Sequence, residues 1–449
     1  MSSSTRVAPP RQAPVAPSPP PLVPTTSPAP PARRSALARA FENTPGRLRL
    51  AAVVGVVVCL VFALLGANAF RSRGDALDAA RAGAEQVVRV QGIATDLAQA
   101  DAVVTNAFLQ GGAASPAALQ QFDGFVAQAS GGIAEAARAE PGDAPALAAV
   151  NQSLTRYSAA IASANANNRL GNEVGSAYLR QASQLLRTPS TTYAAMLPTL
   201  QAVANADAER VDDAFASASW SLYSLFGAGL VVLAGLFAVQ FWLARRTRRM
   251  LNVPLSAGTV TVFVILAFGT FAMLGSQSAA NTVRDTDYTA AKALAQARIA
   301  GFDAKANESL TLVYRGTGGA YEDAWKARYK TASDNLATAA NTGLTDTGIP
   351  ELGRWVPVHT EIRTLDDGGQ WDAAVAKATG SGAQDSPALF GAIAQTSKRA
   401  LDTQAAAVRE GLNSAENLLG LLGWLTLALG LVSAVLAWRG IAQRLEEYR

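Results

Sequence analysis

Very few side chains in this chain are suited to catalysis. The sequence holds one cysteine, Cys59, and one histidine, His359, which lies two residues before Glu361 and could act as a general base. No nucleophile or metal partner is evident near His359, and the chain has no phosphate-binding loop, nucleophile elbow, kinase signature or zinc motif. Cys59 lies within an apolar run, which excludes a disulfide framework. These patterns favour a protein that is not an enzyme and needs no cofactor or metal.

Aromatic and charged side chains outside the apolar runs are the remaining candidates for recognition. Aromatic residues and arginine are enriched at binding hot spots, so a group of them could form a partner or ligand surface. The same aromatics could instead fill and cap the distal end of a helical bundle. Asp101 falls on an apolar helical stripe, where we expect it at the hydrated edge. The candidates are Tyr314, Arg315, Arg354, Trp355, Trp371 and Asp101.

The elements that position these residues follow from a pair of apolar runs, 222–243 and 255–275. Both runs are uncharged and about as long as the ~20 residues that a helix needs to cross a bilayer. The connection 244–253 carries several arginines and no acidic residue, which marks it as cytoplasmic. Its arginines are Arg245, Arg246, Arg248 and Arg249.

Two further apolar runs, 48–70 and 418–438, bring the expected number of membrane spans to four. Both termini are then cytoplasmic, and the chain is a multi-pass protein of the plasma membrane. The formal net charge of +4 hides an uneven distribution, because 71–219 carries −4 and 276–417 carries −3. Basic residues therefore gather inside and acidic residues outside, which indicates membrane topology and argues against nucleic-acid binding.

The segments 71–219 and 276–417 show helical periodicity interrupted by glycine and proline, which predicts two extracytoplasmic antiparallel helical bundles. We expect an all-α fold in which the spans continue unbroken into these bundles. A heptad pattern from Leu401 to Leu419 leads directly into the last span, so 388–440 could form one helix of about 80 Å. The order of elements predicts that the two span–bundle–span units are structural repeats.

Three other segments have weaker interpretations. Residues 1–46 hold twelve of the 21 prolines and are expected to be a disordered cytoplasmic tail, either simply solvated or docking a partner. Glycines inside the second and fourth spans could form a homodimer seam or could pack within one four-span bundle. The segment 439–449 forms a short cytoplasmic tail, with Arg439 and Arg444 as candidate partner contacts.

The paired units resemble the four-helix-bundle sensors of bacterial chemoreceptors and sensor kinases, although no HAMP, kinase or methyl-accepting segment follows. From the first span onward the chain is more similar to actinobacterial GlnX-type membrane proteins. The similarity rests on the Pro-rich start, the two units, the RRTRR loop and the ending WRGIAQRLEEYR. It implies an extracytoplasmic glutamine-binding-type lipoprotein that senses amino acids and meets 71–219 and 276–417. It also implies a cytoplasmic serine/threonine protein kinase G, which adjusts glutamate metabolism and is influenced by the inner arginines.

The sequence thus favours a transmembrane signal relay that binds outside and is read inside, through helix shifts of an ångström or two. Two alternatives remain open. The chain could bind a small ligand directly between its helices, or it could be a structural or accessory subunit of a transporter or envelope complex. Coupled transport is less favoured, because the four spans, counted from Leu50 in the first, contain no Asp, Glu, Lys or Arg.

Overall fold

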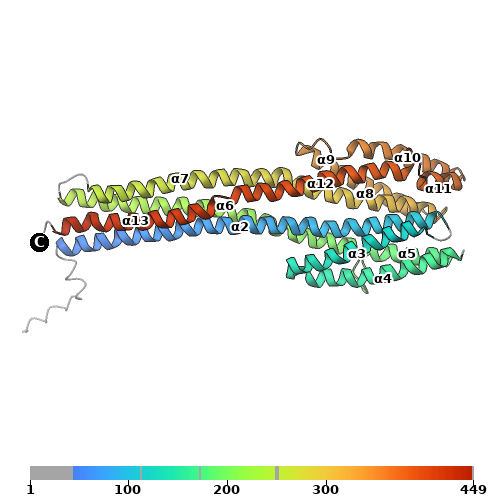
Figure 1. Ribbon diagram of the computed structural model, residues 1–449, viewed down its shortest axis with the longest axis horizontal. Coiled ribbons are helices and arrows are strands. Elements are labelled where there is room, and N and C mark those ends of the chain that lie inside the picture. The colour runs from blue at the N-terminus through green and yellow to red at the C-terminus, as the bar shows by residue number, and fades with distance from the viewer. Residues whose placement is uncertain (1–43, 112–113, 171–172, 248–251, 447–449) are drawn as a thin grey trace, which may run out of the picture.

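A computed structural model describes residues 44–111, 114–170, 173–247 and 252–446, which are helical apart from short connections. Figure 1 shows an elongated molecule in which four long helices run along one half and shorter helices flank them at the other end. The expected all-α fold is confirmed. The Pro-rich tail, apart from its last three residues, lies outside the described residues, as do Arg248 and Arg249.

The first unit starts with α2 (Thr44–Leu109), a single helix of 66 residues that is about 100 Å long at 1.5 Å per residue. Ser115 caps the next helix by accepting a hydrogen bond from the amide of Ala118, and Pro116 occupies its first turn. The elements after α2 are α3 (Pro116–Ala139), η1 (Pro141–Asp143), α4 (Ala144–Arg169), α5 (Val174–Arg187) and α6 (Met196–Thr247). We call the half of the molecule that lies beyond the apolar runs the distal half. The parts of these helices that lie there form the first distal bundle.

The second unit begins with α7 (Val253–Val283), which continues through a π-helical turn, η2 (Arg284–Tyr288), into α8 (Thr289–Val313). The elements that follow are α9 (Gly319–Asn341), α10 (Ile349–Asp367), α11 (Trp371–Thr379), α12 (Ser386–Glu416) and α13 (Leu419–Glu446). Helices α8 to α12 form the second distal bundle. That the two units are repeats of one another stays a prediction.

In the described part of the chain, four helical stretches are long and apolar enough to cross a membrane: Gly46–Leu109, Met196–Arg245, Val253–Val313 and Ser386–Gln443. Large apolar side chains such as Val231, Phe271 and Leu421 are exposed along them, as expected for side chains that face lipid. Their inner faces pack into one apolar core, in which Cys59 is fully buried. The chain therefore has the architecture of a membrane protein.

Small residues bring the apolar helices close together. A Cβ on Gly430 of α13 would lie 2.9 Å from the Cα of Ala63 on α2, and one on Gly229 of α6 would collide with Leu266 of α7. Gly423 of α13 lies against Phe70 of α2. These three glycines of the predicted seam therefore serve packing inside the four-span bundle.

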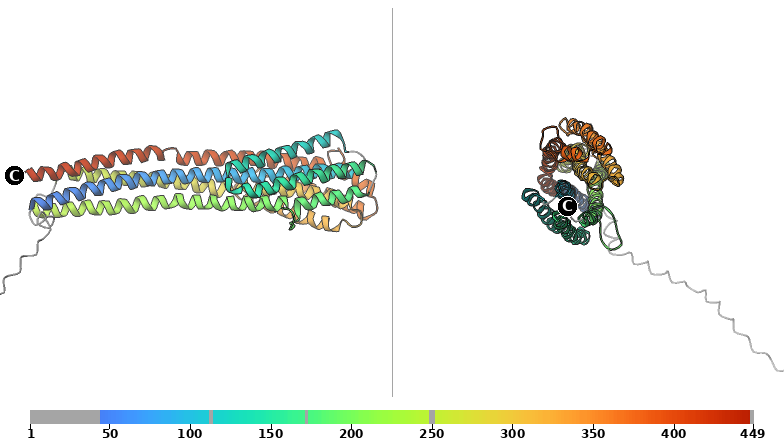
Figure 2. Two further views of the ribbon diagram at one scale, coloured as in Figure 1. Left: turned by 90° about the horizontal axis from the view of Figure 1, so that it is seen from below. Right: turned by 90° about the vertical axis from the view of Figure 1, so that its right-hand side faces the viewer.

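The expected continuity of all four spans is wrong for the last one. Helix α12 ends at Glu416, a turn at Asn417 and Leu418 follows, and α13 begins at Leu419, so 388–440 is not one helix. Figure 2 shows this interruption in the helix nearest the C-terminus. Asn417 is a poor helix former, and Gly420 follows three residues later, which lowers the cost of an interruption. The other three spans pass into the distal bundles without a break in helical structure.

Helix α2 is the central element of the molecule. It packs along α6 and α13 in the apolar half and along α8 in the distal half. The contact with α8 is close because alanines are buried on both helices, including Ala94 and Ala98 on α2 and Ala297 and Ala304 on α8. The two distal bundles therefore touch mainly through α2 of the first unit and α8 of the second.

Candidate functional site

Five polar side chains meet where the two distal bundles touch, and we call them the inter-bundle cluster. Its members are Asp101 of α2, Tyr157 of α4, Arg187 of α5, Asp303 of α8 and Arg328 of α9. Arg187 donates from Nη2 to Asp101 Oδ2 at 2.5 Å and from Nε to Asp303 Oδ1 at 2.6 Å. One arginine thus joins an aspartate of the first unit to an aspartate of the second.

The remaining contacts complete the charge balance of the inter-bundle cluster. The Tyr157 hydroxyl donates to Asp101 Oδ1 at 3.0 Å, and Arg328 Nε lies 2.7 Å from Asp303 Oδ2. The side chain of Asp101 is 1% exposed, that of Asp303 2% and that of Arg187 13%, so the three charges are held away from water. Two carboxylates and two guanidiniums cancel, which is how charged groups are tolerated at such depth.

Burial alone would lower the pKa of Arg187, but the charges of Asp101 and Asp303 outweigh it and raise this pKa above its ordinary value. Burial also raises the pKa of Tyr157 well above its ordinary value, and the neighbouring charge of Asp101 adds to the effect. The arginine is therefore permanently charged and the tyrosine permanently protonated at physiological pH. The cluster acts as a fixed electrostatic connection between the bundles.

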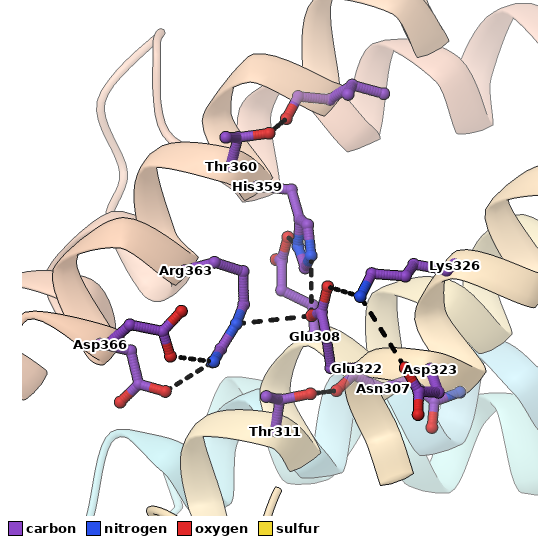
Figure 3. A network of polar contacts seen from close by, with 12 residues as sticks. Asn307, Glu308, Thr311, Glu322, Asp323, Lys326, His359, Thr360, Arg363 and Asp366 are labelled. Carbon is purple, nitrogen blue, oxygen red and sulfur yellow. Dashed lines mark hydrogen bonds and ion pairs between the residues drawn. The ribbon is translucent and has the colours of Figure 1, made fainter. Parts of the chain in front are cut away.

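A second buried group, the His359 cluster, lies inside the second distal bundle and comprises His359, Glu308, Glu322, Lys305 and Ser386. His359 Nδ1 lies 3.0 Å from Glu308 Oε2, and Nε2 lies 3.1 Å from Glu322 Oε2. Lys305 Nζ contacts Glu308 Oε1 at 2.5 Å and donates to Ser386 Oγ at 2.8 Å. Figure 3 shows the imidazole between helices that carry carboxylates, with Arg363 reaching Glu322 from the other side.

The electrostatics of the His359 cluster favour a charged imidazole. Burial would lower the pKa of His359, but its hydrogen bonds to Glu308 and Glu322 raise this pKa above 6.5. Burial alone would raise the pKa of Glu322, but His359 and the nearby Lys326 and Arg363 hold this pKa below its ordinary value. The ring also stacks on Trp325 with centroids 3.5 Å apart. The arrangement is that of a packed ion network, in which the side chain of His359 is 3% exposed.

A third group of polar contacts is centred on Arg73, three residues past the first apolar run. We call Arg73 and its hydrogen-bond partners Ser276, Ala218 and Gln277 the Arg73 node. Arg73 is fully buried and donates from Nε to Ser276 Oγ at 2.9 Å and from Nη1 to Ala218 O at 2.7 Å and Gln277 Oε1 at 2.8 Å. Its Nη2 is buried without a partner among the described residues. The node therefore connects α2 with α6 and α7 where the apolar half of the molecule meets the distal half.

Part of the first unit is similar to a known protein family. Residues 76–216 match the family model described as the actinobacterial sensor domain. No curated protein and no solved structure matches the chain. The sensor-domain region runs from the distal part of α2, just past the Arg73 node, to the same level of α6. It contains Asp101, Tyr157 and Arg187, so three of the five residues of the inter-bundle cluster belong to it. The chain is therefore similar to actinobacterial sensor proteins over its first distal bundle.

The predicted outer candidates are divided between core and surface. Trp355 is fully buried and donates from Nε1 to Ser386 Oγ at 2.8 Å, and Tyr314 is 7% exposed. Trp371 donates to Leu312 O at 2.9 Å and is covered by the guanidinium of Arg315, 3.6 Å from the ring centroid. These aromatics fill the distal bundle, as the second of our two interpretations expected. Arg315 and Arg354 are exposed, and Arg354 lies one residue before the buried Trp355.

Asp101 corrects the sequence interpretation. We expected a hydrated carboxylate at the edge of a stripe, but Asp101 is fully buried. The reason is tertiary, because its partner Arg187 is contributed by α5 and Tyr157 by α4. The expectation of a hydrated position is therefore wrong for Asp101.

The inner arginines do not form a described site. Arg245 is exposed with its guanidinium 4.2 Å from the Phe241 ring centroid, and Arg439 is exposed on α13. The side chains of the other four fall outside the described part of the chain: Arg246, Arg248, Arg249 and Arg444.

Sequence reasoning missed Arg187, Asp303 and Arg73. A signal existed for Arg73, because Phe70, Arg73, Leu77 and Ala80 follow the 3–4 spacing of a buried seam. Arg187 offered none, since it sits at the end of a short polar helix. Among the described residues, no three His, Cys, Asp or Glu side chains converge as metal ligands.

Proposed function

We propose that this protein is a transmembrane relay that reports extracytoplasmic amino-acid availability to the cytoplasm. An extracytoplasmic solute-binding lipoprotein would dock on the distal bundles, and a cytoplasmic serine/threonine protein kinase that controls glutamate metabolism would receive the signal. The protein itself would not catalyse a reaction. The two partners and the kind of solute come from the resemblance to GlnX-type proteins, and the sensing role is supported by the sensor-domain match.

The observation that carries the proposal is the placement of the sensor-domain region on two of the spans. Its first and last helices, α2 and α6, are continuous with apolar segments and pack along each other. A displacement of the distal part of either helix would therefore reach the other side of a bilayer without crossing a flexible joint. Coupling of about 1–3 kcal/mol between the two sides would be typical for such a system.

The proposed orientation can be tested with a pair of exposed arginines. In a Cys59→Ser background, Arg354→Cys and Arg245→Cys place single thiols at opposite ends of the molecule. A membrane-impermeant thiol reagent is expected to label the first in intact cells and the second only after lysis. Labelling of Arg245→Cys in intact cells would reverse the orientation and refute the relay.

The partners can be tested by deletion and complementation. We expect the lipoprotein to copurify with the chain after cross-linking, and the kinase-dependent phosphorylation response to external glutamate to be lost on deletion. Amino-acid uptake should stay intact. Loss of uptake would instead support the accessory-subunit alternative, and an unchanged phosphorylation response would exclude the kinase as the receiver.

A further inference from the structure

A cavity of 370 Å³ lies between the two distal bundles, beside the inter-bundle cluster. Its volume falls in the range of roughly 300–1,000 Å³ that is usual for small-molecule sites. The first bundle contributes α5 and α6 to its wall, and the second contributes α8 and α9. The polar lining includes Arg187, Asp303, Arg328, Gln201, Gln296 and Asn335.

The cavity offers hydrogen-bond donors that can bind an anion. Asp303 is already neutralised, because Arg187 and Arg328 both contact its carboxylate. Arg328 pairs with Asp303 through Nε and has no second ion pair in the described part of the chain, and its side chain is 47% exposed. Its two terminal amino groups are therefore left for another acceptor. The first turn of α6, with Leu197 and Pro198, also lines the cavity, and the start of a helix carries partial positive charge.

The geometry of the hydrogen-bond donors at this cavity favours a carboxylate as the anion. A guanidinium presents two parallel N–H groups that match the two oxygens of a carboxylate. The amides of Gln201, Gln296 and Asn335 offer both donors and acceptors to the rest of a small polar molecule. Ile299 and Ala300 supply the short apolar part of the wall.

We propose that this cavity binds a small carboxylate-bearing solute directly, with Arg328 as its anchor. Arg187 acts as a positioning residue that holds Asp303 in place. The bound solute contacts both bundles at once and favours the arrangement in which they are close. The inference goes beyond the proposed relay, because it gives the chain an input site of its own that requires neither lipoprotein nor kinase.

The test uses the full chain in lipid nanodiscs and isothermal titration with succinate, L-glutamate and the uncharged succinamide. We expect at least one of the two anions to bind and succinamide not to bind. Arg328→Gln should weaken anion binding about 10- to 100-fold, the usual effect of losing a charge-assisted hydrogen bond. Lys330→Gln is the matched control, because Lys330 lies on the same helix in an exposed ion pair with Asp334 and does not line the cavity.

A second variant keeps the test decisive if Arg328→Gln does not fold. Asn335→Leu removes another polar group of the lining, two turns along the same helix, without touching the ion pairs, and it should also weaken binding. No binding of either anion up to about 10 mM would overturn the inference. Equal affinity of the wild type and both cavity variants, or equal binding of succinamide or inorganic phosphate, would overturn it as well. The relay would stand in each case, since its tests measure partner capture and phosphorylation.

Discussion

The sharpest prediction concerns Arg187, which joins the two bundles. Replacement by methionine keeps most of the side-chain length and removes the hydrogen bonds to the carboxylates of Asp101 at 2.5 Å and Asp303 at 2.6 Å, besides one to Ser183 Oγ at 3.0 Å. Each such bond contributes about 1.5–3 kcal/mol. Breaking a buried ion pair by removing one partner costs about 3–5 kcal/mol, because the other charge is left buried. We expect Arg187→Met to destabilise the distal bundles by about 3–5 kcal/mol.

The assay is urea unfolding of the nanodisc-bound chain, followed by the fluorescence of the distal tryptophans. A rescue variant, Arg187→Met with Asp101→Asn and Asp303→Asn, tests the cause, because the two aspartates are no longer charged. We expect it to recover at least half of the loss. A loss below about 1 kcal/mol for Arg187→Met alone, or no recovery on neutralising the aspartates, would refute the assignment of Arg187 as the electrostatic connection.

Three further predictions concern other parts of the molecule. Arg73→Met removes three hydrogen bonds to α6 and α7 and should lower the thermal stability of the four-span bundle by about 1–3 kcal/mol, whereas no change would show that the node is structurally dispensable. Because the pKa of His359 is raised above 6.5, its charge stabilises the fold at acidic pH and this contribution fades as pH rises through the folded-state value. His359→Gln should therefore lower the melting temperature at pH 6 more than at pH 9, and an equal loss at both would contradict a charged ring. Gly430→Val places a side chain against Ala63 and should cost about 1–3 kcal/mol in a nanodisc melting experiment, unlike an exposed control such as Gly420→Val, which has open space around it.

Most of the fold could be predicted from the sequence, because glycine and proline mark the helix ends. Pro116 lies in the first turn of α3, and Pro141 and Gly142 separate α3 from α4. The spans were equally clear, since uncharged runs of this length have few alternatives. The interruption at Asn417 was missed because no glycine or proline stands there and the heptad pattern continues across it.

Much less of the candidate site could be predicted from the sequence. The stripe that contains Asp101 was recognised, but a stripe does not tell whether a charged member finds a partner. That depends on Arg187, 86 positions later, and on Asp303 of the other unit. Contacts of this kind are set by how α2 and α8 approach, and their alanine-rich faces give little sequence signal. Trp355 was ambiguous for a related reason, since aromatics are common both in cores and at binding surfaces.

The turn at Asn417 and Leu418 makes one of the four span–bundle connections different in kind from the others. Axial force applied to α2, α6 or α7 is carried by continuous backbone hydrogen bonds, although η2 makes the third of these less regular. At the end of α12 that ladder is interrupted over two residues, so α13 is coupled to its own bundle less rigidly than the other spans are. Its position is then governed by the neighbours it packs against, α2 and α7. The C-terminal segment would accordingly respond to lateral rearrangement of the other spans. It would move with them and would not transmit axial motion from its own bundle.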